Sequence, residues 1–152
     1  MSMPAQKPGR SFQAYQTPEE FLAAVRLRFG PIHLDAAASA HNAVAERFHD
    51  EAANGLVQSW GPGLTFVNPP YGNIRPWVQK AWAEAALGIN TLMLVPLGCP
   101  NWWVEHVHGK AAVWMLQGRM SFDGKAPFPR DLALLHYGPA VMPGYGVWAW
   151  MS

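Results

Sequence analysis

The stretch Leu64-Thr65-Phe66-Val67-Asn68-Pro69-Pro70-Tyr71-Gly72 decides the fold, because a short apolar run leads directly into a rigid polar turn. Residues 64–67 follow a glycine and suit a buried strand of a parallel sheet. The two prolines end that strand, since neither has a backbone N–H to donate to a neighbouring strand. Asn68 and Tyr71 are therefore expected at the carboxyl edge of the sheet, where ligands bind in open α/β folds.

The chemistry of Asn68 and Pro69 suits an amine attached to an aromatic ring. The side-chain oxygen of Asn68 and the backbone oxygen of Pro69 are two acceptors on a stiff turn, so they can accept both N–H bonds of one NH2 group. Tyr71 adds a flat face for a planar ring. The alternative is that residues 68–71 form only a proline-rich turn after a strand.

The tetrapeptide Asn68-Pro69-Pro70-Tyr71 resembles the catalytic motif of S-adenosylmethionine-dependent amino-methyltransferases, which methylate exocyclic nitrogens, notably N6 of adenine. The resemblance implies that these four residues are catalytic and that the cofactor is S-adenosylmethionine. It also implies that Asn68 borders the cofactor and that Tyr71 stacks on the target base.

Further segments resemble the small, phage-type, Dam-like DNA N6-adenine methyltransferases, in the same order along the chain. They are Thr17-Pro18, Leu34-Asp35 with Ala38, Asn42-Ala43, Gly55-Leu56, Trp60, the motif at 68–71 and Gly118-Arg119-x-x-Phe122. In that family a strand that ends in Leu-Asp, with Ala three residues later, replaces the glycine-rich loop of other methyltransferases. The resemblance covers about residues 15–138. It implies a compact, Rossmann-like α/β methyltransferase fold with a mostly parallel sheet and antiparallel C-terminal strands.

Thr17 and Pro18 are the first candidates for holding the cofactor. They open a predicted helix, with Thr17 as N-cap, Pro18 at the first helical position and Glu20 completing a capping box. The resemblance places them against the methionine end of the cofactor. Free N–H groups at a helix amino end suit the carboxylate of that part.

Asp35 and Asp50 are the acidic candidates for the cofactor site. Asp35, near the end of a strand predicted at 32–38, stands beside small residues that include Ala37, so a ligand could approach closely. It could accept a hydrogen bond from an ammonium group or complement a sulfonium; alternatively it is a solvated cap of the next helix. Asp50 follows residues 43–48, which are either a helix end or a short second strand. In the wider class of methyltransferases that the chain resembles, an acidic residue after the second strand holds the ribose hydroxyls, so the resemblance makes Asp50 the candidate; a solvated loop is the alternative.

The substrate candidates besides Tyr71 are two arginines and a phenylalanine. The resemblance suggests that Phe122 closes the adenine pocket opposite Tyr71 and that Arg119 meets phosphate. The alternatives are core packing for Phe122 and a surface charge for Arg119. The basic patch expected on the side where Tyr71 emerges comprises Arg75, Arg119, Lys125 and Arg130.

Hydrophobic periodicity predicts the other elements of an α/β fold in which strands alternate with helices early and crowd together late. A helix from Pro76 to about Leu87 is expected, followed by a short helix at 100–106. Buried strands are expected at 64–67, 91–96, 112–116, 131–137 and 146–151. This order favours a doubly wound sheet with an antiparallel pair at one end.

The chain of 152 residues is expected to form a single domain over residues 12–152 after a disordered lead-in at residues 1–11. No apolar run approaches the ~20 residues of a membrane span, and no signal peptide is visible, so no membrane partner is expected. The single Cys99 excludes an internal disulfide and fits a reducing cytoplasm. The resemblance to phage-type enzymes implies that this is the cytoplasm of a bacterial host of a phage or prophage. His106 and His108 are the only histidines close together in the sequence, and no carboxylate or Cys stands at metal-ligand spacing from them, so no metal is expected.

Three functions agree with these patterns. The first is methylation of adenine N6 in duplex DNA, with the base flipped out of the stack. The second is the same chemistry on another amine: N4 of cytosine, RNA or a glutamine side chain. The third is a nucleic-acid-binding module without catalysis, which the intact motif at 68–71 disfavours. A net charge of +1 requires any DNA contact to use a local basic patch, and the sequence does not decide between a monomer and a weak dimer.

Overall fold

The computed structural model describes residues 16–38 and 41–151, so the lead-in expected at residues 1–11 lies outside the described residues. The described elements alternate as an α/β fold. The helices are α1 (Glu19–Phe29), the 3-10 turn η1 (Gly55–Val57), α2 (Arg75–Ala86) and α3 (Asn101–His106). The strands are β1 (Leu34–Asp35), β2 (Arg47–Phe48), β3 (Thr65–Val67), β4 (Thr91–Pro96), β5 (Ala112–Leu116), β6 (Leu132–Tyr137) and β7 (Gly144–Trp148). None of the described helices has the length and apolar character needed to cross a membrane.

The strands form one seven-stranded sheet in the order β2-β1-β3-β4-β6-β5-β7. Strands β1 to β4 pair in parallel, and β6 pairs antiparallel with both β4 and β5. The last strand, β7, runs parallel to β5. The predicted mixed sheet, mostly parallel with antiparallel pairing late in the chain, is confirmed.

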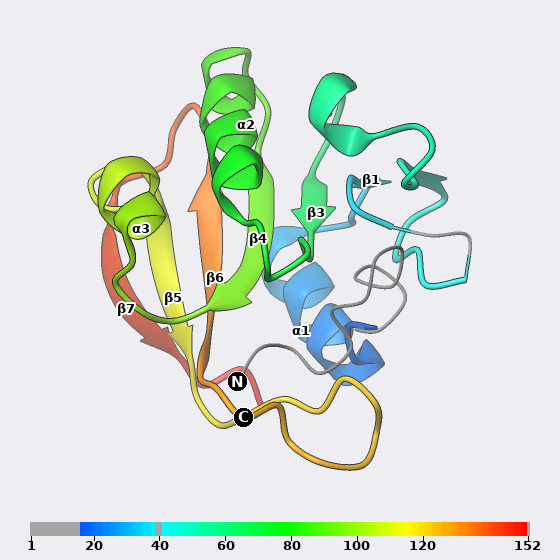
Figure 1. Ribbon diagram of the computed structural model, residues 1–152, viewed down its shortest axis with the longest axis vertical. Coiled ribbons are helices and arrows are strands. Elements are labelled where there is room, and N and C mark those ends of the chain that lie inside the picture. Colours follow the sequence, from blue (N-terminus) through cyan, green and yellow to red (C-terminus); the bar gives the residue numbers. More distant parts are fainter. Residues whose placement is uncertain (1–15, 39–40, 152) are drawn as a thin grey trace.

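Helices cover both faces of the sheet, and strand β4 shows the consequence most clearly. All six of its residues are buried, because alternate side chains enter two separate hydrophobic cores. Leu92 and Leu94 pack in the core that contains Phe21 of α1. Met93 and Val95 pack in the core that contains Val78 of α2. Figure 1 shows α2 and α3 lying over the sheet on the same side.

The start of α1 differs from the sequence prediction. The N-cap residue is Pro18, and no side chain caps the helix, so the predicted Thr17 cap and the Glu20 capping box are wrong. Instead, the Pro18 carbonyl oxygen accepts hydrogen bonds from the backbone N–H groups of Phe21 and Leu22. Thr17 therefore lies one residue before the N-cap. Its hydroxyl accepts a hydrogen bond from Asn68, which follows β3.

The first strand is much shorter than predicted, two residues instead of the seven expected at 32–38. The Asp35 carboxylate accepts hydrogen bonds from the backbone N–H groups of Ala37 and Val44, which folds the chain back at the strand end. The strand alternative for residues 43–48 is confirmed by β2. Strands β4 and β5 have the predicted bounds, because long apolar runs between turn residues mark their limits.

Candidate functional site

The carboxyl ends of β1, β2 and β3 meet at one edge of the sheet. The backbone N–H of Ala36 donates to the Phe66 oxygen at 3.1 Å, and that of Ala38 donates to the His49 oxygen at 3.0 Å. These bonds carry the pairing beyond the short strands. They bring the segment after Asp35 close to the residues that follow β2 and β3.

Asn68 stands at the end of β3 and contacts the segment before α1. Its side-chain Nδ2 donates a hydrogen bond to Oγ1 of Thr17 at 3.1 Å. Its Oδ1 is buried and has no hydrogen-bond partner among the described residues. A buried acceptor without a partner is costly unless a ligand satisfies it, so Oδ1 is suited to receive an N–H donor.

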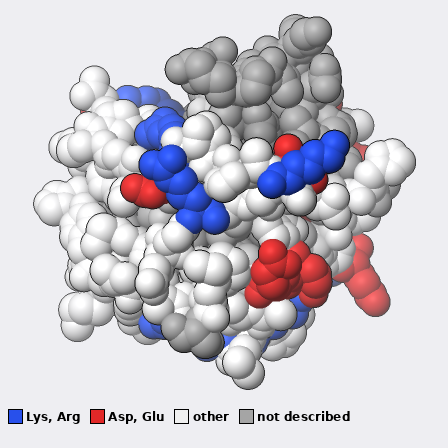
Figure 2. All heavy atoms as spheres, turned by 90° about the horizontal axis from the view of Figure 1, so that it is seen from below, with Lys and Arg blue, Asp and Glu red and all other residues white. Residues whose placement is uncertain are grey.

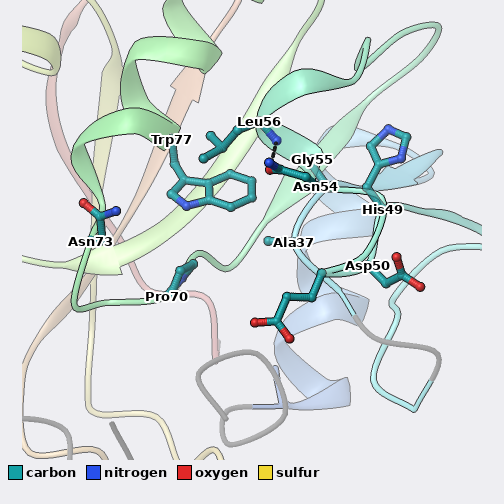
Figure 3. A pocket seen from close by; sticks show the side chains of 11 residues that line it. Ala37, His49, Asp50, Asn54, Gly55, Leu56, Pro70, Asn73 and Trp77 are labelled. Carbon is teal, nitrogen blue, oxygen red and sulfur yellow. Dashed lines mark hydrogen bonds between the residues drawn. The ribbon is translucent and has the colours of Figure 1, made fainter. Parts of the chain in front are cut away.

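A cavity of about 320 Å³ opens at this edge, within the range of small-molecule sites. We call it the strand-edge cavity, and Figure 3 shows it from close by. Its lining residues are Ala36, Ala37, His49, Asp50, Glu51, Asn54, Gly55, Leu56, Pro70, Asn73 and Trp77. It therefore contains Ala37 and Asp50 among the predicted cofactor residues, and it borders the motif at 68–71 through Pro70.

Asp50 offers a carboxylate to this cavity. Its Oδ1 accepts a hydrogen bond from the Ala53 backbone N–H at 2.8 Å, which orients the side chain. An ionised carboxylate has about four acceptor positions, so capacity for ligand hydroxyls is left. The side chain is half-buried, so Asp50 is more enclosed than the freely solvated loop alternative.

Trp77 of α2 also lines this cavity. Its side chain projects toward the strand-edge cavity beside Gly55 in Figure 3, although only 4% of the residue is exposed. The ring stacks on that of Trp60, with centroids 6.3 Å apart and planes inclined by 21°. Helical spacing marks Trp77 as inward-facing, but that signal does not separate a core position from a cavity wall.

Asp35 is enclosed, with 4% of the residue exposed, so the alternative of a solvated cap is wrong. Its oxygens accept from Ala37 N at 3.2 Å and Val44 N at 3.1 Å. Burial raises the pKa of the carboxyl to about 6, and the two hydrogen bonds partly oppose that rise. Its direct contacts are with the backbone of the loop after β1, which includes cavity residue Ala37.

Tyr71 belongs to a group of three aromatic rings. Its centroid lies 6.4 Å from that of Phe122 and 5.6 Å from that of Phe128, and both contacts are edge-on. Phe122 and Phe128 also meet, at 5.4 Å. The structure thus brings the predicted Phe122 next to Tyr71. Phe128 was missed, because nothing local distinguishes it in the connection between β5 and β6.

A second cavity, of about 480 Å³, separates the amino end of α1 from the β5–β6 connection. Its lining residues are Gln16, Thr17, Pro18, Glu19, Glu20, Ser121, Phe122, Asp123 and Gly124. Thr17 and Pro18 therefore face Phe122 across this space, which we call the α1 cavity. The motif at 68–71 lines the first cavity through Pro70 and is joined to a wall of the second by the hydrogen bond from Asn68 to Thr17.

The predicted basic residues are in contact with other groups of the protein. Arg75 forms an exposed ion pair with Glu105, and Arg119 Nε lies 3.3 Å from Asp131 Oδ1. Arg130 donates to the backbone oxygen of Leu97 at 3.2 Å. In the view from below, Figure 2 shows Lys and Arg side chains with acidic side chains close to them.

The histidine pair singled out in the sequence has protein partners. His106 Nε2 lies 3.4 Å from Arg75 Nη1 and 3.3 Å from Gln79 Nε2, while His108 Nδ1 lies 2.9 Å from the Tyr145 hydroxyl. In the part of the chain that the structure describes, no group of three or more His, Cys, Asp or Glu residues could hold a metal ion.

Comparisons with known proteins point to one family. The sequence model of the family described as DNA N-6-adenine-methyltransferase (Dam) matches residues 6–131. A protein of Escherichia phage T1 named DNA N-6-adenine-methyltransferase is 33% identical over 104 residues, which are 66% of this chain and 44% of the relative. A protein of the same name from Haemophilus phage HP1 is 30% identical over 92 residues, 59% of this chain and 53% of the relative. The chain thus spans about half the length of these relatives, and no solved structure matches it.

Proposed function

We propose that this chain, which belongs to the DNA N-6-adenine-methyltransferase (Dam) family, transfers a methyl group from S-adenosylmethionine to N6 of an adenine in DNA. The observation that carries the proposal is the position of Asn68. Its buried Oδ1 has no partner among the described residues, and its segment lines the strand-edge cavity and is hydrogen-bonded to Thr17 in the wall of the α1 cavity. The strand-edge cavity can take the nucleoside part of a cofactor, and the α1 cavity lies between residues proposed for its methionine end and residues proposed for the base, so two reactants would meet near this side chain.

The strand-edge cavity is the proposed place of the nucleoside part of the cofactor. Asp50 would accept hydrogen bonds from the ribose hydroxyls, and the Trp77 ring would form a wall for a flat base. The strand-edge cavity has room for a nucleoside, because Ala36, Ala37 and Gly55 add little side-chain bulk at the strand ends. When bound, S-adenosylmethionine supplies an electrophilic methyl group on a sulfonium sulfur.

Thr17, Pro18 and Asp35 are proposed to serve the methionine end. The amino end of α1 carries backbone N–H groups beyond the two that Pro18 accepts, and such groups favour a carboxylate. Asp35 would act through its charge, which complements an ammonium or sulfonium group, and through the loop that its hydrogen bonds hold. Its raised pKa, about 6, leaves the carboxyl mostly ionised at neutral pH.

The proposed catalytic step depends on two hydrogen-bond acceptors of the motif at 68–71, the Asn68 side-chain oxygen and the Pro69 backbone oxygen. The lone pair of the adenine amine is conjugated with the ring and is a poor nucleophile. If Asn68 Oδ1 and the Pro69 oxygen accept its two N–H bonds, the nitrogen is shifted toward a tetrahedral, attacking form. As the carbon–nitrogen bond forms, the methyl–sulfur bond would break and leave a neutral thioether, and the amine would then lose one proton to solvent, because neither acceptor is a base. Pro69 and Pro70 hold the two acceptors at a constant separation, which is a positioning effect.

The base must leave the DNA stack to reach this buried oxygen, at a cost of a few kcal/mol. Stacking on Tyr71, whose ring is packed edge-on against Phe122, would offset part of that, since aromatic stacking contributes about 1–3 kcal/mol per base. Arg75 and Arg119 are proposed phosphate contacts. Their carboxylate partners do not preclude this, because exposed ion pairs contribute little to stability.

We place the reaction in the cytoplasm of a bacterial host, where phage and host DNA are available.

Nucleoside analysis of duplex DNA treated with the protein and S-adenosylmethionine tests this function. The expected product is N6-methyladenine, detected by mass spectrometry after enzymatic digestion. N4-methylcytosine would assign the same chemistry to the other amine. Unmodified DNA, combined with no heat on titration of the protein with S-adenosylmethionine, would indicate a binding module without catalysis.

A further inference from the structure

Building on the proposed function, we infer that Thr17 is a positioning residue for methyl transfer. Its hydroxyl oxygen accepts from Asn68 Nδ2 at 3.1 Å and thereby keeps Asn68 Oδ1 turned toward the substrate amine. Thr17 would act through Asn68, a role separate from any contact that it makes with the cofactor.

The two ends of an asparagine amide have opposite hydrogen-bonding character, and this makes orientation decisive. The Nδ2 end is only a donor and the Oδ1 end is only an acceptor. An NH2 group on the substrate also presents donors, so it is bound by Oδ1 and repelled by Nδ2. Rotating the amide by half a turn would therefore replace an attractive contact with a donor facing a donor.

The surroundings of the amide make a partner for Nδ2 necessary. Asn68 is partly buried and its Oδ1 is fully enclosed, so an Nδ2 without an acceptor would carry a desolvation penalty in the reactive orientation. Thr17 is itself buried, with 6% exposed, and it supplies the acceptor. The Thr17 hydroxyl is available because Pro18, and not Thr17, is the N-cap of α1.

Replacing Thr17 with Val removes the hydroxyl and keeps the shape, whereas Ser keeps the hydroxyl and removes a methyl group. At saturating cofactor and DNA, the Thr17→Val protein should lose about ten- to a hundredfold in kcat, which corresponds to one unsatisfied buried donor. The Thr17→Ser protein should stay within about threefold of wild type. The dissociation constant for S-adenosylmethionine, measured by calorimetry, should change much less than kcat in both variants, because the contacts proposed for the amino end of α1 are backbone N–H groups, which neither substitution removes.

Testing Thr17→Val in a protein that also carries Asn68→Asp distinguishes a positioning role of Thr17 from a purely structural one. An Asn68→Asp side chain has acceptors at both ends and no N–H, so an amide orientation no longer needs to be held. If Asn68→Asp retains measurable turnover, adding Thr17→Val to it should lower kcat by less than about threefold. A purely structural role of Thr17 would cost the same in both backgrounds. If Asn68→Asp is inactive, the comparison of Val and Ser in the wild-type background decides.

Besides an equal cost in both backgrounds, each of the following would overturn the inference while wild type is active: wild-type kcat in Thr17→Val, a loss confined to cofactor affinity, or equal losses in the Val and Ser variants. A Thr17→Val protein with a lowered melting temperature is compared at a temperature where circular dichroism shows it to be folded. Failure of the proposed function is distinguishable, because wild type itself would then form no N6-methyladenine.

Discussion

The backbone of Gly55 passes so close to Ala36 that a Cβ atom at residue 55 would lie 2.0 Å from the Ala36 carbonyl oxygen. The contact joins the loop after β1 to η1, and both segments line the strand-edge cavity. The Trp60 indole N–H donates to the Gly55 oxygen at 2.8 Å and fixes the approach from the other side. A residue without a side chain is thus needed where the two walls of the cavity meet.

Substitution of Gly55 with Ala should therefore separate the two walls. Because the added methyl meets backbone atoms, which cannot rotate away, we expect a destabilisation of about 1–3 kcal/mol and a weaker affinity for S-adenosylmethionine. Urea unfolding and calorimetric titration measure the two effects. Gly144→Ala in β7 is the matched control, since an added Cβ there meets nothing within 4 Å. Equal affinity in both variants would argue against a cofactor in this cavity.

Asp35 should make the stability of the fold depend on pH. Its pKa is raised from 3.8 to about 6 in the folded protein, so the folded state binds the proton more tightly than the unfolded chain does. The free energy of unfolding should therefore fall as pH rises from about 4 to 6 and level off above that, by an amount of order 3 kcal/mol. Urea unfolding of wild type and Asp35→Asn across this range isolates the effect, because only wild type should show this component. Parallel pH profiles of the two proteins would contradict it.

Asp123 should control DNA binding through the connection between β5 and β6. Its Oδ1 accepts from the Lys125 and Ala126 backbone N–H groups and from the Ser121 hydroxyl, and the Lys125 bond contributes most to holding its pKa below the usual range. Asp123→Ala should loosen the turn next to Phe122 and raise KM for DNA about five- to thirtyfold. Cofactor affinity should not change. Asp123→Asn, which keeps a carbonyl oxygen, is the control, and an unchanged KM in the Ala variant would reject the role.

Local patterns predicted the sheet and placed Asn68 at the carboxyl end of β3, and long-range contacts account for what they missed. Strands β4 and β5 were located correctly because continuous apolar runs end at turn residues. Thr17 has the local signature of an N-cap, yet its hydroxyl contacts Asn68, 51 residues away. No local pattern encodes a contact at that distance. Phe128 was missed for the same reason, since its importance comes from packing against Tyr71 in a separate element.

Methyl transfer by the Asn68→Ala protein tests the central claim most directly. The variant removes the buried Oδ1 and keeps the strand-edge cavity, so S-adenosylmethionine should bind with nearly wild-type affinity in a calorimetric titration. The single-turnover rate of N6-methyladenine formation in duplex DNA should fall by about a hundred- to a thousandfold, the typical effect of removing one preorganised catalytic hydrogen bond. A variant that methylates adenine at the wild-type rate, or a wild-type protein whose product is N4-methylcytosine, would contradict the account.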